Sequence, residues 1–261
     1  MTLRRLQRSW ERAAQKDPLF AILTLPDKRG RWDVSEFFAW GRDEIALVLH
    51  YVESLGLRMR RGRALDFGCG IGRLTQALAP HFETVDGVDI APTMIRLAET
   101  KNEFGVRCRY HLNERADLGM FPDEAFDFVY SNITLQHMDP GLAAEYLREF
   151  LRVLRRDGVL LFQLPAEPLG VWPEDQAQPP ASSPRLSKRL GRAVLPASVT
   201  RRYRRARYWI ANQPFSRIEA HGIPQDDVVA LLQDNGGRVI DIRPDTWQPR
   251  WASFRYCVIK A

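Results

Sequence analysis

The sequence predicts an α/β fold whose core is one mostly parallel, seven-stranded sheet flanked by helices. Two observations carry this prediction. From residue 63 onward, short apolar runs alternate with stretches of helical spacing, and turn-forming glycines or prolines separate them. Strands that alternate with helices in this way pair in parallel through right-handed crossovers. The expected strands cover residues 64–67, 84–89, 106–111, 126–130, 159–164, 238–242 and 254–259.

The helices between these strands have recognisable start and stop signals. Pro92 and Pro140 suit the first turns of two helices, because a proline at the first helical position sacrifices no intrahelical hydrogen bond. The helix from Pro92 is expected to run to about Glu103, and Gly158 is expected to stop the helix from Pro140. Shorter helices are expected over residues 74–78 and 226–234.

The chain length favours a single domain. A chain of 261 residues buries one good core more readily than two. We expect four parts in it: a helical N-terminal lid, the first five strands with their helices, a basic insertion after the fifth strand, and a closing helix with two strands. These parts cover residues 1–60, 61–165, 166–222 and 223–261.

The positive charge of the chain is concentrated in the insertion. The net charge is +6, yet residues 176–218 hold ten Lys or Arg and no Asp or Glu, so the remainder carries 6 − 10 = −4. Such a segment can be a solvated face whose arginines pair with the acidic remainder. It can also bind an anionic small molecule, a phosphopantetheine-bearing carrier or an anionic membrane surface, and nucleic acid is the less favoured partner.

Composition also limits the class of protein. The three cysteines, Cys69, Cys108 and Cys257, lie far apart with no metal-ligand spacing, so we expect no metal site and no disulfide framework. No apolar run is long enough to cross a bilayer, and no signal-peptide pattern follows the basic N-terminus. These features favour a cytoplasmic location, with a peripheral membrane location as the alternative because of the basic insertion.

A glycine loop joins the first expected strand to the following helix. It reads Asp66-Phe67-Gly68-Cys69-Gly70-Ile71-Gly72. A dinucleotide site holds a pyrophosphate on bare backbone amides at a helix N-terminus. The carboxylate of Asp66 at the strand end would repel that anion, but it suits a cofactor that carries an ammonium and a sulfonium. The loop therefore argues against a dehydrogenase.

The loop resembles motif I of the class I S-adenosylmethionine-dependent methyltransferases, written (E/D)xGxGxG, and the resemblance covers roughly residues 63–164. It implies a Rossmann-like fold with S-adenosyl-L-methionine (SAM) as cofactor and S-adenosyl-L-homocysteine (SAH) as product. In that family the acid positions the methionine moiety and the glycines let the backbone approach it. Carried over, these roles fall on Asp66, Gly68, Gly70 and Gly72, with Cys69 contributing backbone.

The ends of the second and third strands extend the resemblance. Asp89 ends the second strand, where an acid accepts hydrogen bonds from both ribose hydroxyls. Ile90 is expected to pack on the adenine, and Met94 either contacts the adenine or fills the core. Asn113 stands where the family usually has an acid that accepts from the adenine amino group. It either serves that group through its carbonyl oxygen or is a turn residue.

The end of the fourth strand is expected to face the methyl group, from Ser131 to His137. Methyl transfer from a sulfonium needs alignment and exclusion of water more than covalent help. An oxygen nucleophile can also need a base, and His137 is the candidate catalytic residue. The alternative is that His137 is structural, hydrogen-bonded to backbone and lining the pocket.

The sequence therefore predicts transfer of a methyl group from SAM to an oxygen, less readily a nitrogen, of a small-molecule, saccharide or lipid-linked acceptor. Nucleic-acid methylation is one alternative, although Ser131-Asn132-Ile133-Thr134 lacks the (D/N)PP(Y/F) pattern of exocyclic amino methylation. A non-catalytic binding module of the same fold is the other. The sequence does not specify the oligomeric state.

Overall fold

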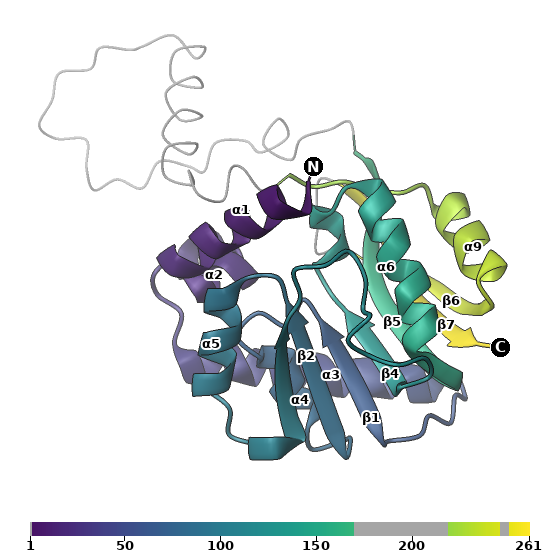
Figure 1. Ribbon diagram of the computed structural model, residues 1–261, viewed down its shortest axis with the longest axis horizontal. Coiled ribbons are helices and arrows are strands. Elements are labelled where there is room, and N and C mark those ends of the chain that lie inside the picture. The colour runs from purple at the N-terminus through teal and green to yellow at the C-terminus, as the bar shows by residue number, and fades with distance from the viewer. Residues whose placement is uncertain (1, 170–218, 246–250) are drawn as a thin grey trace, which may run out of the picture.

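The computed structural model describes residues 2–169, 219–245 and 251–261, so the basic segment 176–218 lies outside the described residues. The described chain forms one seven-stranded sheet in the order β3-β2-β1-β4-β5-β7-β6 (Figure 1). The strands are β1 (Arg63–Phe67), β2 (Thr84–Asp89), β3 (Cys108–Leu112), β4 (Phe126–Ser131), β5 (Leu154–Pro168), β6 (Gly237–Asp245) and β7 (Trp251–Lys260).

The sheet is mixed in one place. Strands β1 to β5 pair in parallel, whereas β7 pairs antiparallel with both β5 and β6. The prediction of seven strands in a mostly parallel sheet is confirmed, and β6 and β7 form an antiparallel hairpin at its edge. The lid and insertion roles of the flanking segments stay predictions.

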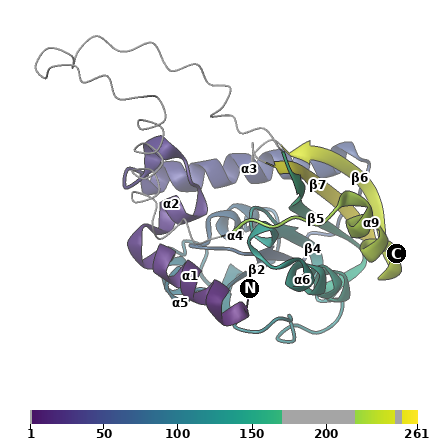
Figure 2. The ribbon, with the colours of Figure 1, turned by 90° about the horizontal axis from the view of Figure 1, so that it is seen from above.

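Helices cover both faces of the sheet. Their bounds are α1 (Leu3–Lys16), α2 (Pro18–Ile22), α3 (Val34–Ser54), α4 (Arg73–Leu78), α5 (Pro92–Thr100), α6 (Pro140–Val153) and α9 (Gln225–Asp234). Short 3₁₀ turns are η1 (Pro26–Lys28), η2 (Gly105–Arg107) and η3 (Leu135–His137). Helices α6 and α9 pack in one hydrophobic core, and α3 and α4 pack in another on the opposite face (Figure 2). Among the described residues, no helix is long and apolar enough to cross a membrane.

Several element boundaries differ from the sequence-based expectation, and α5, for example, ends at Thr100 instead of near Glu103. Helix α6 ends at Val153 and β5 starts at Leu154, so Gly158 lies inside a strand instead of stopping the helix. Leu154 already pairs with Phe126 of β4, and the register then shifts around Asp157, whose φ is +61°. Strand β3 starts later than expected, because η2 occupies the residues before Cys108. At the start of β5, tertiary pairing outweighed the local signal.

Helices α1 and α2 lie across the carboxyl edge of the sheet (Figure 1). Helix α1 is tied to α5 by Glu11, whose carboxylate accepts from the Thr93 amide at 2.9 Å and from the Thr93 hydroxyl at 2.6 Å. Helix α2 is capped by Asp17, whose Oδ1 accepts from the Phe20 amide at 3.2 Å. These contacts place the apolar face of α1 over the ends of β1 and β2.

Candidate functional site

The loop after β1 depends on glycine for its shape. Gly68, Gly70 and Gly72 have φ values of +83°, +53° and +83°, in the left-handed region that side chains disfavour. The Gly68 and Cys69 amides donate to the Val88 carbonyl at 2.8 and 2.9 Å, which holds the loop against β2. A Cβ on Gly68 would collide with the Thr134 side chain. Gly68 and Gly70 thus let the side chains of Thr134 and Ile22 pack directly against the backbone of the loop.

Asp89 at the end of β2 faces this loop. Its Oδ2 accepts from the Gly70 amide at 2.9 Å and its Oδ1 accepts from the Ala91 amide at 2.8 Å. Each oxygen keeps a further lone pair. No described cation forms an ion pair with it, and burial raises the pKa of Asp89 to about 6. The carboxylate is thus positioned by backbone amides and free to accept from hydroxyl groups.

A cavity opens above the loop and brings most of the predicted residues together. Eight of them line it: Gly68, Cys69, Gly70, Asp89, Ile90, Met94, Asn113 and His137. The N-terminal helices close it with Leu6, Trp10 and Ile22. Asp66, Gly72 and Ser131 do not line it.

Asp66 lies beneath the loop. Only 1% of it is exposed, and its Oδ2 accepts from the Thr75 hydroxyl at 2.7 Å. Burial raises the pKa of Asp66 to about 7. A Cβ on Gly72 would collide with Tyr110 of β3, so that glycine serves close packing below the cavity. Direct contact of Asp66 with a bound methionine moiety stays a prediction, and the geometry shows a carboxylate that ties the loop to α4.

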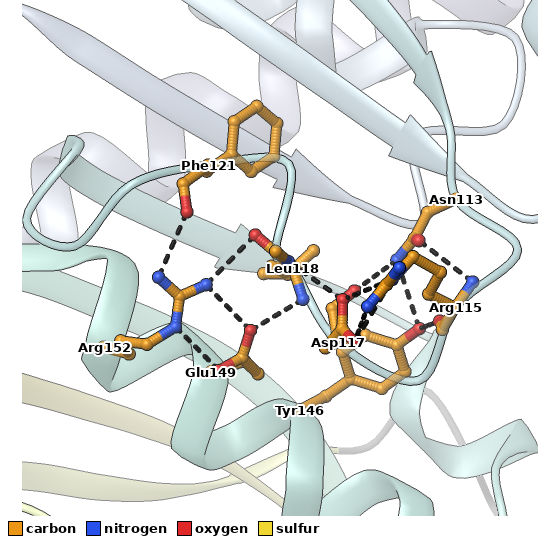
Figure 3. Close-up of polar contacts among 9 residues, drawn as sticks. Asn113, Arg115, Asp117, Leu118, Phe121, Tyr146, Glu149 and Arg152 are labelled. Carbon is orange, nitrogen blue, oxygen red and sulfur yellow. Dashed lines mark hydrogen bonds and ion pairs between the residues drawn. The ribbon is translucent and has the colours of Figure 1, made fainter.

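Asn113 organises the turn that follows β3 (Figure 3). Its side-chain amide donates to the Asp117 carbonyl at 2.9 Å and to the Tyr146 hydroxyl at 3.3 Å, and its Oδ1 accepts from the Arg115 amide at 3.1 Å. The Tyr146 hydroxyl donates to the Arg115 carbonyl at 2.6 Å. The side chain therefore acts as a turn residue while it also lines the cavity.

Helix α6 holds the rest of this turn (Figure 3). The Arg152 guanidinium donates to the Leu118 carbonyl at 3.0 Å and to the Phe121 carbonyl at 3.1 Å. The Leu118 amide donates to Glu149 at 2.7 Å, and Glu149 pairs with Arg152 at 2.7 Å. One wall of the cavity is thus fixed from behind by charged side chains of α6.

His137 lies in η3 with both ring nitrogens engaged. Its Nδ1 lies 3.2 Å from the Glu219 carbonyl oxygen, and a carbonyl only accepts, so Nδ1 carries the proton. Its Nε2 then accepts from the Gln136 amide at 3.1 Å. Burial lowers the pKa of His137 to about 4, and Trp10 packs edge-on against the ring at 5.1 Å. The imidazole is neutral near pH 7 and forms part of the cavity wall.

Ser131 lies behind the cavity, fully buried in β4. Its hydroxyl has no hydrogen-bond partner among the described residues. The loop after it is held by Gln163 of β5, whose Oε1 accepts from the Ile133 amide at 3.2 Å. The Gln163 amide donates to the Ser253 hydroxyl at 2.6 Å. Ile133 has a φ of +58°, which is strained for a β-branched residue.

Two functional candidates escaped the sequence reasoning. The side chain of Arg73 is 4% exposed and lines the cavity, and its Nη2 pairs with Glu44 of α3 at 2.9 Å. Its Nε has no hydrogen-bond partner among the described residues. A signal existed for Arg73, because a cation in the first turn of a helix opposes the helix dipole. Glu44 had no such signal, since only the packing of α3 brings it here.

The fold and the cavity define a class of protein, namely an α/β domain that binds its ligand over a glycine loop at the carboxyl edge of the sheet. Residues 65–162 match the family model described as a methyltransferase domain. Residues 65–162 therefore form a methyltransferase domain of the class I, SAM-dependent kind.

Among curated proteins, the chain is similar to a 2-methyl-6-phytyl-1,4-hydroquinone methyltransferase of Synechocystis, with 33% identity over 98 residues, covering 37% of this chain and 30% of that protein. It is also similar to a malonyl-(acyl-carrier protein) O-methyltransferase of Halorhodospira halophila, with 31% identity over 151 residues, covering 52% of this chain and 50% of that protein. The chain thus spans half or less of the length of these relatives. The magnesium protoporphyrin IX methyltransferase of Synechocystis, solved with bound SAH, superposes with a TM-score of 0.53 at 16% identity, covering 84% of this chain and 83% of that one.

Proposed function

We propose that the chain binds SAM above the loop Gly68–Gly72 and transfers its methyl group to an oxygen or nitrogen of a small-molecule acceptor. One observation carries this proposal: the Asp89 carboxylate and the bare glycine backbone line the same cavity, and no described cation pairs with that carboxylate. The methyltransferase domain of residues 65–162 and the SAH in the related magnesium protoporphyrin IX enzyme support it.

The lining residues fit SAM at both of its ends. Asp89 is placed to accept from the ribose hydroxyls, and Ile90 and Met94 offer apolar surface to the adenine. At the other end, the Nε of Arg73 has no hydrogen-bond partner among the described residues, so it can donate to the carboxylate of the methionine moiety. Gly68, Cys69 and Gly70 line the cavity between these groups.

When bound, SAM supplies a methyl group on an electrophilic sulfonium. The residues of the chain align the acceptor with the methyl group and exclude water, which are the main requirements of such a transfer. Leu6, Trp10, Ile133 and Met138 give the cavity an apolar rim that excludes water from the reacting atoms. The fixed loops after β1 and β4 keep that rim in place.

We favour an oxygen acceptor over a nitrogen. The curated relative from Halorhodospira halophila is an O-methyltransferase, and a second relative, from Xanthomonas euvesicatoria, is a ubiquinone biosynthesis O-methyltransferase with 34% identity over 94 residues. His137 stays the candidate base from the sequence. Its low pKa and its two engaged nitrogens favour the other sequence-based alternative, a structural part of the wall.

Contact of the basic insertion with an anionic acceptor or a membrane surface also stays a prediction. The segment 176–218 that carries it lies outside the described residues.

Calorimetry with SAH tests the cofactor proposal. We expect a dissociation constant below about 0.1 mM, and we expect Asp89→Ala to weaken binding at least tenfold, since one hydrogen-bonded charged acceptor contributes about 1.5–3 kcal/mol. Asp227→Ala removes an exposed carboxylate from α9 and is the matched control, expected to bind like the wild type. No binding at millimolar SAH, or equal binding by Asp89→Ala, would contradict the proposal.

Label transfer tests the reaction. The full chain, incubated with methyl-labelled SAM and a cell extract, should place label in small molecules, which mass spectrometry then identifies. Label found only in bulk tRNA would favour the nucleic-acid alternative. SAH binding without label in any fraction would favour the non-catalytic alternative.

A further inference from the structure

A second cavity lies next to the first. Helix α3 forms one wall with Trp40, Leu47 and Tyr51, and the β6–β7 hairpin forms another with Arg243 and Arg255. Arg73, Asn132 and Ile133 line both cavities. The two spaces therefore meet at the loop after β4, which is where the methyl group of a bound cofactor is expected.

The boundary between the two cavities contains a strained backbone conformation. Ile133 takes a left-handed conformation with a φ of +58°, and Gln163 holds its amide. Asn132 is held from the other side, because its amide donates to Glu44 at 2.7 Å. Backbone strain that the surrounding structure maintains is concentrated at functional sites. The strained backbone at Ile133 therefore favours a functional role for the boundary between the two cavities.

The guanidinium groups of the second cavity already have carboxylate partners. Arg73 pairs with Glu44 at 2.9 Å and Arg255 pairs with Asp245 at 3.0 Å. Arg243 pairs with Asp241 at 2.7 Å and stacks over the Tyr51 ring at 4.2 Å. The positive charges of this cavity are therefore already balanced, and an anionic ligand meets no unpaired cation among the described lining residues. An uncharged ligand would leave them intact.

Asp43, the remaining carboxylate among the lining residues, does not change the charge balance of the cavity. Asp43 forms no ion pair within the described part of the chain, and it is exposed to solvent. Water screens an exposed charge, so Asp43 contributes little to the selection of a charged ligand.

The wall of α3 leaves apolar surface exposed among the described residues. Trp40 is 39% exposed and Leu47 is 70% exposed, and both line the cavity. Leu23 and Ile133 continue this surface toward the first cavity. Single exposed apolar side chains are ordinary, but two that line one concave space beside a cofactor cavity offer a binding surface for an apolar body.

We propose that the second cavity binds the methyl acceptor, and that the acceptor is an uncharged molecule with an aromatic or aliphatic body and a hydroxyl group. This inference rests on the proposed function. The acceptor oxygen forms the new bond to the methyl carbon as the methyl–sulfur bond breaks. The bonding electron pair stays on sulfur, and the hydroxyl proton leaves to solvent.

A pair of fluorescent probes tests the class of ligand. N-phenyl-1-naphthylamine is uncharged, and 8-anilinonaphthalene-1-sulfonate is the same arylamine with a sulfonate. We expect the uncharged probe to bind at least tenfold more tightly. We expect Leu47→Asp to weaken its binding at least fivefold, because a carboxylate replaces the apolar wall. Val106→Asp, at a residue 85% exposed on η2, is the matched control and should bind it like the wild type.

Two probe results would overturn the proposal. Equal binding of the uncharged probe by Leu47→Asp and the wild type would show that the second cavity does not bind it. Tighter binding of the sulfonate, lost in Arg243→Ala, would show that the cavity selects anions.

Methyl transfer then links the cavity to the reaction. With methyl-labelled SAM, uncharged naphthols should be labelled at least tenfold faster than naphthoic acids that carry a hydroxyl group. Leu47→Asp should lower this rate while its SAH affinity, measured by calorimetry, stays within twofold of the wild type. If SAH binds to the wild type but Leu47→Asp does not alter the rate, the acceptor site is wrong and the proposed function stands. If SAH does not bind to the wild type, the proposed function fails and the acceptor role fails with it.

Discussion

Two loops at the same edge of the sheet reach a left-handed backbone by different means. The loop after β1 uses Gly68, Gly70 and Gly72, for which positive φ carries little steric penalty. The loop after β4 uses Ile133, for which it carries a penalty of about 1–2 kcal/mol. The backbone amide of Ile133 donates to the side-chain oxygen of Gln163, which holds Ile133 in place.

The difference shows where each conformation comes from. The first loop is specified mainly by its own residues, because glycine adopts a positive φ with little steric penalty. The second is imposed by distant residues of β5 and β7, through the chain Ile133–Gln163–Ser253. A change in the first loop should therefore act at the altered residue, and a change in the second should act through its partners.

The largest effect is expected for Gly68→Ala. The new Cβ would face Thr134 and the backbone would be strained at a φ of +83°, so we expect a loss on the order of 3 kcal/mol of unfolding free energy and no measurable SAH binding. Chemical denaturation and calorimetry measure both. Gly56→Ala is the control, because Gly56 has a φ of +72° and no atom lies within 4 Å of the added Cβ. Equal losses in the two variants would mean that strain alone, and not close packing, requires the glycine.

Gln163→Leu tests the second loop. It leaves the Ile133 amide and the Ser253 hydroxyl without this partner in the interior, so we expect a loss on the order of 2 kcal/mol of unfolding free energy. In an Ile133→Gly background the same substitution should lose about 1 kcal/mol less, because glycine adopts this φ without support. Urea denaturation of the four proteins gives the coupling energy. Strict additivity would show that Gln163 does not hold Ile133 in its strained conformation.

Asp89 ties the first loop to β2 and should make SAH affinity depend on pH. Burial raises its pKa to about 6, so the carboxylate is ionised at pH 7.5 and protonated at pH 5. The ionised form is the better acceptor for ribose hydroxyls, and affinity should fall about tenfold between pH 7.5 and pH 5. Asp89→Asn should bind weakly with no such dependence. Calorimetry across this range checks it, and an equal pH dependence in Asp89→Asn would assign the titration to another group, such as the nearby Asp66.

His137 in the second loop should have the smallest effect. Its pKa of about 4 keeps the ring neutral from pH 5.5 to 8, and its Nε2 is engaged by Gln136. We expect His137→Ala to lower turnover less than about tenfold and to leave SAH affinity within about twofold, because the change opens the wall without removing a charge. Initial rates with the acceptor found by label transfer measure it. A loss above a hundredfold at unchanged SAH affinity would establish His137 as a base.

The sequence alone predicted the type of sheet and many of the residues that line the cavity. Alternation of strands and helices predicted the sheet, and the spacing of Asp66 to Gly72 together with Asp89 predicted which strand ends meet at one cavity. These features are local in the chain, since they depend on periodicity, on turn residues and on glycines that nothing else can replace. The boundary between α6 and β5 was misplaced, because pairing of Leu154 with Phe126 is not visible in local pattern.

Only the tertiary structure decided which groups reach the cavity and in what state. It buried Asp66 beneath the loop, engaged both nitrogens of His137, and brought Glu44 from α3 to Arg73 and Asn132. Each of these depends on contacts between residues far apart in the chain, whose burial and hydrogen bonding set the pKa and the available donors. The sequence by itself determined the glycine loop and Asp89, the acid that faces it. Positive φ favours glycine in the loop, and the position of Asp89 follows from the end of β2.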